Sequence, residues 1–304
     1  MSNESTEYRV LGCLGGLYEL ENARGARLFC RARGAFRHAD TRVLVGDLVR
    51  VAGEGEDVAI EEILPRKNAL IRPRMANLDV LVAVTAVKEP SPVFDTLDKL
   101  LAICAHSGIE CAVVLSKCDL AADAEIAVLA DVYERAGYPV FALSTQMERG
   151  VDAFENYLDT VLTGGRTVAF AGASGVGKST LLNAVFEGIS RETGSVSEKI
   201  GRGRHTTRDV HLFEGRGGFV ADTPGFSMLD FLRFDFFSLE ELPATFPEVD
   251  RLAHECRYAD CTHRREEECA VREAVRLGEI AETRYASYCA LYDVLKEKKK
   301  KAYK

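Results

Sequence analysis

The chain has no apolar run long enough to cross a membrane. Its longest apolar stretches, 78–87 and 111–115, have the length of strands, whereas a spanning helix needs about 20 apolar residues. We also expect no secretion leader, because Glu4, Glu7 and Arg9 interrupt the start of the given sequence. We therefore expect a soluble, cytoplasmic protein with no membrane partner.

The sequence also lacks the cysteine pattern of a disulfide framework. Five of its nine cysteines stand singly, at positions 13, 30, 104, 111 and 118, and an odd total leaves one without a partner. This arrangement favours a reducing compartment and one local metal cluster.

Acidic side chains outnumber basic ones by 47 to 39, and the net charge of −8 by itself argues against a nucleic-acid partner. Two segments depart from this balance. Residues 199–208 carry four basic side chains and no acid, and the last nine residues carry six lysines against Glu297. We favour a solvated, disordered lysine-rich end, with contact to a phosphate backbone as the alternative.

Residues 8–64 alternate short β-rich runs with glycine-rich turns and contain no helix-length amphipathic segment. The close spacing predicts a small antiparallel barrel. An OB fold is the natural barrel of this size, although an SH3-like barrel would give much the same pattern. Such barrels often bind RNA. The expected strands are 8–14, 18–20, 26–33, 48–51 and 58–63.

After residue 67, strands alternate with helices, which predicts a parallel, doubly wound α/β sheet of about six strands. From about Phe234 the pattern becomes helical and charged, and it ends in a helix near 281–296. We expect three domains: a barrel over 1–67, an α/β domain over 68–233 and a helical domain over 234–304. The α/β strands are expected at 78–87, 111–115, 140–143, 167–171, 210–213 and 219–221, and its helices at 93–106, 122–136 and 152–162.

A phosphate-binding loop follows the apolar strand 168–171 and precedes a helix-forming segment. Glycines let backbone N–H groups curl around phosphates, Lys178 places a charge near the β and γ oxygens, and Ser179 can ligate Mg²⁺. The motif predicts binding of a nucleotide together with Mg²⁺. Its residues are Gly172, Ala173, Ser174, Gly175, Val176, Gly177, Lys178 and Ser179, followed by Thr180.

A second motif, D-T-P-G at 222–225, follows the apolar strand 219–221. In P-loop NTPases an Asp here holds Mg²⁺, and a Gly three residues on gives a backbone N–H to the γ-phosphate. A plain turn is the alternative, but the place behind a strand favours this second switch, with Asp222 and Gly225 in these roles. The first switch would lie in 201–208. There we assign Thr207 to Mg²⁺, with Thr206 as the alternative.

Residues Ser116, Lys117, Cys118 and Asp119 follow the strand 112–115 and match a guanine-reading motif. The Asp119 carboxylate can accept two hydrogen bonds from guanine, which adenine cannot supply, and the Lys117 stem would cover the base. Ser144 matches a further motif that flanks the guanine O6, with a helix cap as the alternative. We therefore expect GTP and GDP as ligands.

The guanine motif precedes the phosphate loop, whereas in an ordinary GTPase it follows. Both loops would lie at the carboxyl ends of neighbouring strands in one sheet. Because domain termini commonly lie close together, the site can still assemble in a circularly permuted domain.

Phe226 stands where many GTPases carry a Gln that orients the attacking water. A phenyl ring cannot do this, so either hydrolysis is slow or another residue does the work. His205 is our candidate catalytic residue, because a neutral imidazole can orient water. A solvent-facing spectator histidine is the alternative.

Cys256, Cys261, His263 and Cys269 lie within fourteen residues as C-x4-C-x-H-x5-C. Three thiolates and one imidazole can close a tetrahedral zinc site and leave no position for water, so we expect one structural zinc per chain. Burial of free thiols in an apolar core fits the polar neighbours less well. His254 and Cys289 are possible substitute ligands.

Taken together, the permuted order and the motifs G-A-S-G-V-G-K-S, G-R-H-T-T, D-T-P-G-F and C-x4-C-x-H-x5-C resemble the small ribosomal subunit biogenesis GTPase RsgA (YjeQ) family. The resemblance covers about Asn68 to Cys269, and more loosely the barrel. It implies an OB fold, a permuted GTPase domain and a zinc-binding domain.

The resemblance also implies binding to the small ribosomal subunit and its rRNA late in maturation, with GTP hydrolysis stimulated there, and a catalytic role for His205. Ser116 departs from the Asn of many members, which braces neighbouring loops, so we expect looser nucleotide binding with unchanged base choice. A metabolic P-loop kinase and an RNA-binding scaffold with a structural nucleotide are the competing functions. We expect a monomer.

Overall fold

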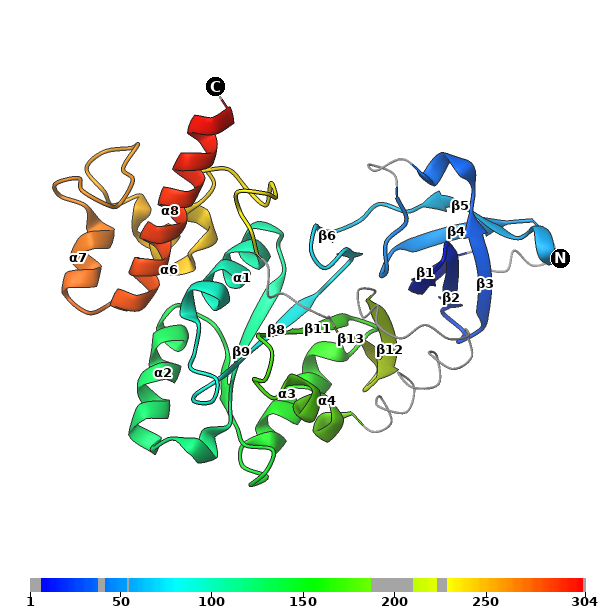
Figure 1. Cartoon of the computed structure of the whole chain (residues 1–304), viewed down its shortest axis with the longest axis horizontal. Helices are drawn as coiled ribbons and strands as arrows, with labels where there is room; N and C mark the ends of the chain where they lie inside the picture. The colour runs from blue at the N-terminus through cyan, green and yellow to red at the C-terminus, as the bar shows by residue number, and fades with distance from the viewer. Residues whose placement is uncertain (1–6, 38–41, 54, 187–209, 223–228, 303–304) are drawn as a thin grey trace. The chain divides into compact units, whose positions relative to one another are not determined.

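The computed structural model describes residues 7–37, 42–53, 55–186, 210–222 and 229–302 (Figure 1). The predicted roles of His205, Thr206, Thr207, Gly225 and Phe226 lie outside these ranges. The chain divides into two compact units, each of which is described by itself. Unit 1 contains Met1–Asp79, Leu158–Phe170 and Phe186–Gly225, and unit 2 contains Val80–Tyr157, Ala171–Val185 and Phe226–Lys304.

Unit 1 begins with a closed barrel of five strands, in the neighbour order β1-β2-β3-β5-β4. The strands β3 and β5 are parallel, so the expectation of a wholly antiparallel barrel is wrong at this pair. A closed ring with an odd number of strands cannot be antiparallel throughout. The five-stranded Greek-key order is that of an OB fold. The strands are β1 (Glu7–Leu14), β2 (Leu17–Asn22), β3 (Arg27–Ala32), β4 (Leu48–Ala52) and β5 (Ala59–Ile63).

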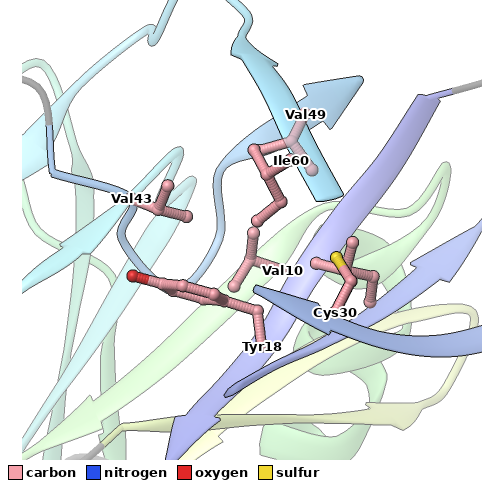
Figure 2. Close-up of a cluster of buried hydrophobic side chains, with 7 residues drawn as sticks. Val10, Tyr18, Cys30, Val43, Val49 and Ile60 are labelled. Atoms are coloured by element: carbon pink, nitrogen blue, oxygen red, sulfur yellow. The ribbon is translucent and has the colours of Figure 1, made fainter. Parts of the chain in front are cut away.

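The barrel interior is filled by apolar side chains from every strand, as Figure 2 shows. Along β2 the side chains alternate, because Tyr18 and Leu20 point into the core while Glu19 and Glu21 lie on the outer face. Each large apolar side chain buried in this way contributes about 1.5–3 kcal/mol. The buried cluster consists of Val10, Tyr18, Leu20, Cys30, Val43, Val49 and Ile60.

The rest of unit 1 supplies β11 (Thr167–Ala171), β12 (His211–Gly215) and β13 (Gly218–Asp222). The β11–β13 pair is parallel, but β12 runs antiparallel to β13, so the predicted parallel sheet has one antiparallel edge. The reason is the short turn between them: Arg216 and Gly217 both have positive φ, and a two-residue hairpin can only join antiparallel strands.

The barrel packs against this hairpin inside unit 1. Gly12 approaches the His211 ring so closely that an added Cβ would lie 2.5 Å from His211 Cδ2. His211 Nε2 and Glu19 Oε2 are 3.0 Å apart. The Arg9 guanidinium lies 4.5 Å from the centre of the Phe219 ring and donates to Thr167 Oγ1 at 3.2 Å. Charged side chains and a close backbone approach therefore join the barrel to the α/β sheet.

Unit 2 holds the other strands of the sheet, β8 (Val80–Ala86), β9 (Glu110–Ser116) and β10 (Val140–Ala142), paired in parallel. Every residue of β8 is buried, as expected for a parallel strand covered on both faces. The six strands form one sheet in the order β10-β9-β8-β11-β13-β12. We had expected the motif-bearing strands β9 and β11 to be neighbours. This expectation is wrong, because β8 lies between them.

The helices agree closely with their predicted ranges. They are α1 (Phe94–His106), α2 (Asp123–Arg135), α3 (Val151–Leu162) and α4 (Lys178–Val185). A two-stranded ribbon of β6 (Ala69–Leu70) and β7 (Met75–Ala76) precedes β8. Among the described residues, no helix combines the length and apolar character that a bilayer span requires.

The C-terminal part of unit 2 consists of α6 (Pro247–Ala253), α7 (Ala270–Arg276) and the long α8 (Glu282–Ala302), coloured red in Figure 1. Our preference for a disordered lysine-rich end is wrong, because α8 continues through it. Nearby oxygen atoms offset the repulsion between the lysines: Lys299 pairs with Glu240, and Lys301 with Glu297. A short 3-10 turn over Pro243–Thr245 precedes α6.

Candidate functional site

The phosphate loop joins the end of β11 to the start of α4, as the sequence predicts. Gly172 is required by a close approach, since an added Cβ would lie 2.3 Å from the carbonyl oxygen of Val84. Gly175 and Gly177 have φ of +81° and +89°, which other residues rarely adopt. Ser174 and Gly175 are exposed, while Val176 is buried. The tip of the loop is therefore open to solvent, while the buried Val176 side chain anchors it.

Ser116, at the end of β9, ties the guanine motif to the phosphate loop. Its hydroxyl lies 2.5 Å from the carbonyl oxygen of Val176 and 3.2 Å from that of Thr85. A hydroxyl carries one hydrogen, so the two acceptors share it. The serine thus supplies a brace of the kind we expected only from an Asn at this position.

The carboxylate expected to read guanine lies beside the serine of the second base motif. Ser144 Oγ donates to Asp119 Oδ1 at 2.5 Å and accepts from the backbone N–H of Met147 at 3.3 Å. Ser144 is buried, whereas Asp119 is exposed. Ser144 therefore fixes the orientation of the carboxylate, a contact that the sequence did not predict.

Lys117 and Cys118 complete this edge of the site. Lys117 has φ of +57°, and its ammonium donates to the backbone carbonyl of Glu89. Cys118 is buried, and its thiol lies 3.2 Å from the carbonyl oxygen of Leu115. The left-handed backbone at Lys117 turns the chain so that Asp119 projects outward while Cys118 anchors the turn.

Asp222 is the last residue of β13 in unit 1, where its backbone is paired with Phe170 and His211. It therefore ends a strand, as the second-switch prediction requires. Ser179, the predicted Mg²⁺ ligand of the phosphate loop, lies in the first turn of α4. Thr207 and Gly225, predicted to contact Mg²⁺ and the γ-phosphate, lie outside the described residues, as does His205.

Four predicted metal ligands converge in the C-terminal part of unit 2. One ligand atom each from Cys256, Cys261, His263 and Cys269 lies within 4.8 Å of the others. Zn–S bonds of about 2.3 Å and a Zn–N bond of about 2.0 Å place tetrahedral ligands about 3.5–3.8 Å apart. The separations found are 3.8 Å for Cys256 Sγ to Cys269 Sγ, and 3.4 and 3.6 Å from these atoms to His263 Nδ1.

The surroundings of this cluster suit a metal. Burial lowers the pKa of His263, which favours the neutral imidazole that a metal ion needs. The substitute ligands considered from sequence are not part of the cluster: His254 is exposed and faces Glu255, and Cys289 lies on α8. The donor set is therefore the compact one.

Side chains from α8 hold the metal-binding loop in place. The hydroxyls of Tyr285 and Tyr288 donate to the backbone carbonyls of His263 and Thr262 at 2.8 and 3.1 Å. Arg264 pairs with Asp293 through two hydrogen bonds of 2.7 and 2.9 Å. Contacts of this kind keep ligands oriented and are part of a metal site.

A buried charge cluster near the metal module was not predicted. Arg284 on α8 donates to Asp98 Oδ1 of α1 at 2.6 Å and to Glu248 Oε1 of α6 at 2.7 Å, and all three side chains are at most 3% exposed. Burial raises the pKa of Asp98, while Arg284 opposes this shift. The sequence offered one signal for this cluster: Asp98 places a carboxylate on the buried face of α1, where a charge needs a partner.

The fold and the site together define a circularly permuted P-loop GTPase with an N-terminal OB barrel and a C-terminal Cys3His cluster. The family model described as the RsgA N-terminal domain matches residues 8–60, and the family model described as the RsgA GTPase matches residues 63–232. The chain therefore belongs to the RsgA GTPase family.

Curated relatives and solved structures agree with this assignment. The chain is 41% identical over 297 residues to the small ribosomal subunit biogenesis GTPase RsgA of Leuconostoc citreum, covering 96% of both chains. It is 43% identical over 285 residues to the protein of the same name from Moorella thermoacetica, covering 93% of this chain and 94% of that protein.

Two solved structures share the fold. YloQ, described as a circularly permuted GTPase, superposes with a TM-score of 0.77 at 30% identity, over 97% of this chain and 96% of that one. YjeQ from Thermotoga maritima gives a TM-score of 0.78 at 32% identity, over 95% and 98%. The predicted permuted architecture is confirmed.

Proposed function

We propose that this GTPase binds the small ribosomal subunit, acts in its late maturation, and hydrolyses GTP faster when bound there. The supporting observation is the joined site of unit 2, in which Ser116 connects the base motif to the phosphate loop and Ser144 orients Asp119. The names of the family's curated relatives support the ribosomal role.

Nucleotide binding is divided among the loops in this proposal. Asp119 reads the base, Lys117 covers it, and the backbone of the phosphate loop surrounds the phosphates. Mg²⁺ would be held by Ser179, Thr207 and Asp222, and it would neutralise charge that develops on the phosphates. The GTP-binding residues are Ser116, Lys117, Cys118, Asp119, Ser144, Gly172, Ala173, Ser174, Gly175, Val176, Gly177, Lys178, Ser179, Thr180, Asp222 and Gly225.

The chemical step is attack of a water molecule on the γ-phosphorus. The bond from this phosphorus to the β–γ bridging oxygen breaks, GDP leaves, and the proton of the water ends on the released phosphate. Phe226 cannot orient the water, so we assign this task to His205. Slow hydrolysis in the free protein, and faster hydrolysis on the subunit, follow if the ribosome brings His205 into place.

We further infer one structural zinc ion per chain, held by Cys256, Cys261, His263 and Cys269. The separations among Cys256, His263 and Cys269 suit a tetrahedral site, and with Cys261 as the fourth ligand the site is closed and has no position for a substrate or water. The metal would fold the loop that α8 supports, and it would take no part in hydrolysis.

For rRNA contact we propose the outer face of the barrel together with the basic segment 199–208. On the barrel, Phe29 of β3 is 55% exposed. Leu17, on the neighbouring strand β2, and Leu14, its partner on β1, are also exposed. Arg31 is directly opposite Leu17 in the β2–β3 pair. An exposed aromatic ring beside a cation is suited to stacking on unpaired bases.

We propose that the protein acts as a cytoplasmic monomer with three functional domains, 1–67, 68–233 and 234–304. The decisive experiment compares steady-state GTP hydrolysis with and without purified small subunits. Stimulation at saturating GTP supports the proposal. Nucleotide binding without stimulated hydrolysis would favour an RNA-binding scaffold, and phosphate transfer to a small molecule would favour a kinase.

A further inference from the structure

One carboxylate organises the loop that carries the imidazole of the metal-binding cluster. Glu266 Oε1 accepts from the backbone N–H and the hydroxyl of Thr262 at 3.0 and 2.5 Å. Glu266 Oε2 accepts from the backbone N–H groups of Arg264 and Arg265, both at 3.0 Å. These donors lie on both sides of His263 in the sequence, so a single side chain closes the loop around this ligand.

His263 has a backbone conformation that a histidine rarely adopts. Its φ is +61°, in the left-handed region that favours glycine, and its side chain is buried. Such a conformation costs free energy and persists only where surrounding contacts offset that cost. The hydrogen bonds to Glu266 are contacts of this kind, because they fix the backbone on either side of His263.

Helix α8 holds the carbonyl groups of the same loop. The hydroxyls of Tyr285 and Tyr288 donate to the carbonyl oxygens of His263 and Thr262. Glu266 pairs with N–H groups and the tyrosines pair with carbonyls, so both kinds of backbone polar group near the imidazole have partners. The two sets of contacts use different atoms, and neither replaces the other.

Glu266 is distinct from the metal ligands. The ligand atoms that converge belong to Cys256, Cys261, His263 and Cys269. Both carboxylate oxygens of Glu266 are engaged by N–H and O–H donors of the loop. Its backbone carbonyl accepts from the Arg272 guanidinium of α7 at 3.0 Å. The residue is therefore anchored to a helix while its side chain holds the loop.

We propose that Glu266 is a positioning residue for the metal site. Its carboxylate holds His263 in the left-handed conformation, in which Nδ1 lies 3.4 and 3.6 Å from the sulfur atoms of Cys256 and Cys269. The inference rests on the proposed zinc site and deepens it, because it assigns a role to a residue that does not bind the metal. An imidazole that is already oriented needs less ordering when the metal binds, so the site binds the metal more tightly.

Glu266→Gln should therefore weaken zinc binding. The amide keeps one acceptor oxygen, but its NH₂ group faces N–H donors from which it cannot accept. Loss of a residue that orients a metal ligand typically costs about 10–100-fold in metal affinity. Thr262→Val removes only the hydroxyl hydrogen bond and leaves the backbone bonds, so it should cost less.

The next residue in the chain provides the matched control. Glu267 is exposed and carries the same charge one position on. Glu267→Gln removes one negative charge from the neighbourhood of the metal but leaves the hydrogen bonds of Glu266 in place. This variant separates the loss of those bonds from a loss of electrostatic attraction. Its zinc affinity should equal that of the unmodified protein.

The test measures the zinc dissociation constant of the full-length protein by competition with a chromophoric chelator. A second pair of proteins, with and without Glu266→Gln, carries His263→Gly. Glycine adopts the left-handed conformation without cost and offers no imidazole, so Glu266 has no ligand to position there. We expect Glu266→Gln to cost about 10–100-fold in the unmodified background and little in the His263→Gly background.

A purely structural role would give the same loss in both backgrounds, and that result overturns the inference. So does a Glu266→Gln variant that binds zinc as tightly as Glu267→Gln. Should Glu266→Gln fail to fold, or the His263→Gly proteins bind too little zinc to measure, Thr262→Val decides. A weaker affinity than that of Glu267→Gln supports the inference, and an equal one opposes it. Absence of zinc from the unmodified protein would instead contradict the proposed zinc site, and the inference with it.

Discussion

At the scale of single residues, the carboxylate of Asp119 is expected to select guanine. Asp119→Asn replaces one acceptor by a donor, so the variant should bind GTP more weakly and accept xanthosine triphosphate, whose 2-position carries an oxygen. Because Ser144 Oγ is 2.5 Å from Asp119 Oδ1, the amide can keep its orientation. Titration with the three nucleotides measures this, and equal affinity of the unmodified protein for GTP and ATP would contradict the assignment.

His205 is expected to act on the transition state. His205→Ala should lose most of the hydrolysis rate that small subunits stimulate while keeping its GTP affinity, because the imidazole contacts the attacking water and not the bound nucleotide. The measurement is steady-state hydrolysis at saturating GTP. An unchanged stimulated rate in the variant would remove His205 from the mechanism.

At the scale of the elements, metal binding should govern the C-terminal helices alone. Cys261→Ser should release zinc and loosen α6, α7 and α8, because metal binding and local folding are coupled. GTP binding should be largely unchanged, since its loops lie on β9, β10 and β11. Elemental analysis and nucleotide titration of the same preparation test both statements, and freshly purified protein without zinc would refute the proposed site.

The buried Arg284 fastens α8 to α1 and α6. Arg284→Met leaves the Asp98 and Glu248 carboxylates buried without their cation, so we expect a loss of about 3–5 kcal/mol in stability. Urea denaturation measures this loss. Arg276→Met is the control, because its pair with Glu273 lies at the surface and should matter little. Equal effects of the two variants would show that the cluster is not structural.

At the scale of the whole molecule, the attachment of the barrel to β12 should depend on pH. The hydrogen bond from His211 lowers the pKa of Glu19 despite its burial. A carboxyl group with a lowered folded-state pKa contributes stability above its unfolded-state value and loses it as the pH falls through the folded-state value. The unmodified protein should therefore lose stability below about pH 4.5, the ordinary pKa of Glu.

Glu19→Gln should be less stable than the unmodified protein at neutral pH and should show a smaller loss in acid. Unfolding temperatures recorded from pH 7 to 3 test this. Glu61→Gln is the matched control in the same barrel, because its pair with Arg33 is exposed. If both variants follow the same pH dependence, the contact between Glu19 and His211 does not stabilise the attachment.

Much of this protein could be predicted from local patterns. Strand and helix periodicity predicted the barrel strands and the strands and helices of the α/β domain to within a few residues, because a short segment by itself decides which face is apolar. It gave no ranges for β6, β7, α6 and α7. The four metal ligands could be found because they lie within fourteen residues of one another. The phosphate loop could be found because the local backbone conformation requires glycine, as the positive φ of Gly175 and Gly177 illustrates.

Only the tertiary structure decided which distant residues meet. Ser116 and Val176 are 60 residues apart, and Arg284 and Asp98 are 186 apart. No periodicity records such pairs, because they depend on how finished elements pack. The parallel β3–β5 pair is likewise set by closure of an odd ring, and the helical lysine-rich end is supported by the partner that Lys299 finds in Glu240. The sequence by itself determined the chemistry and the local elements, whereas packing determined how they are braced.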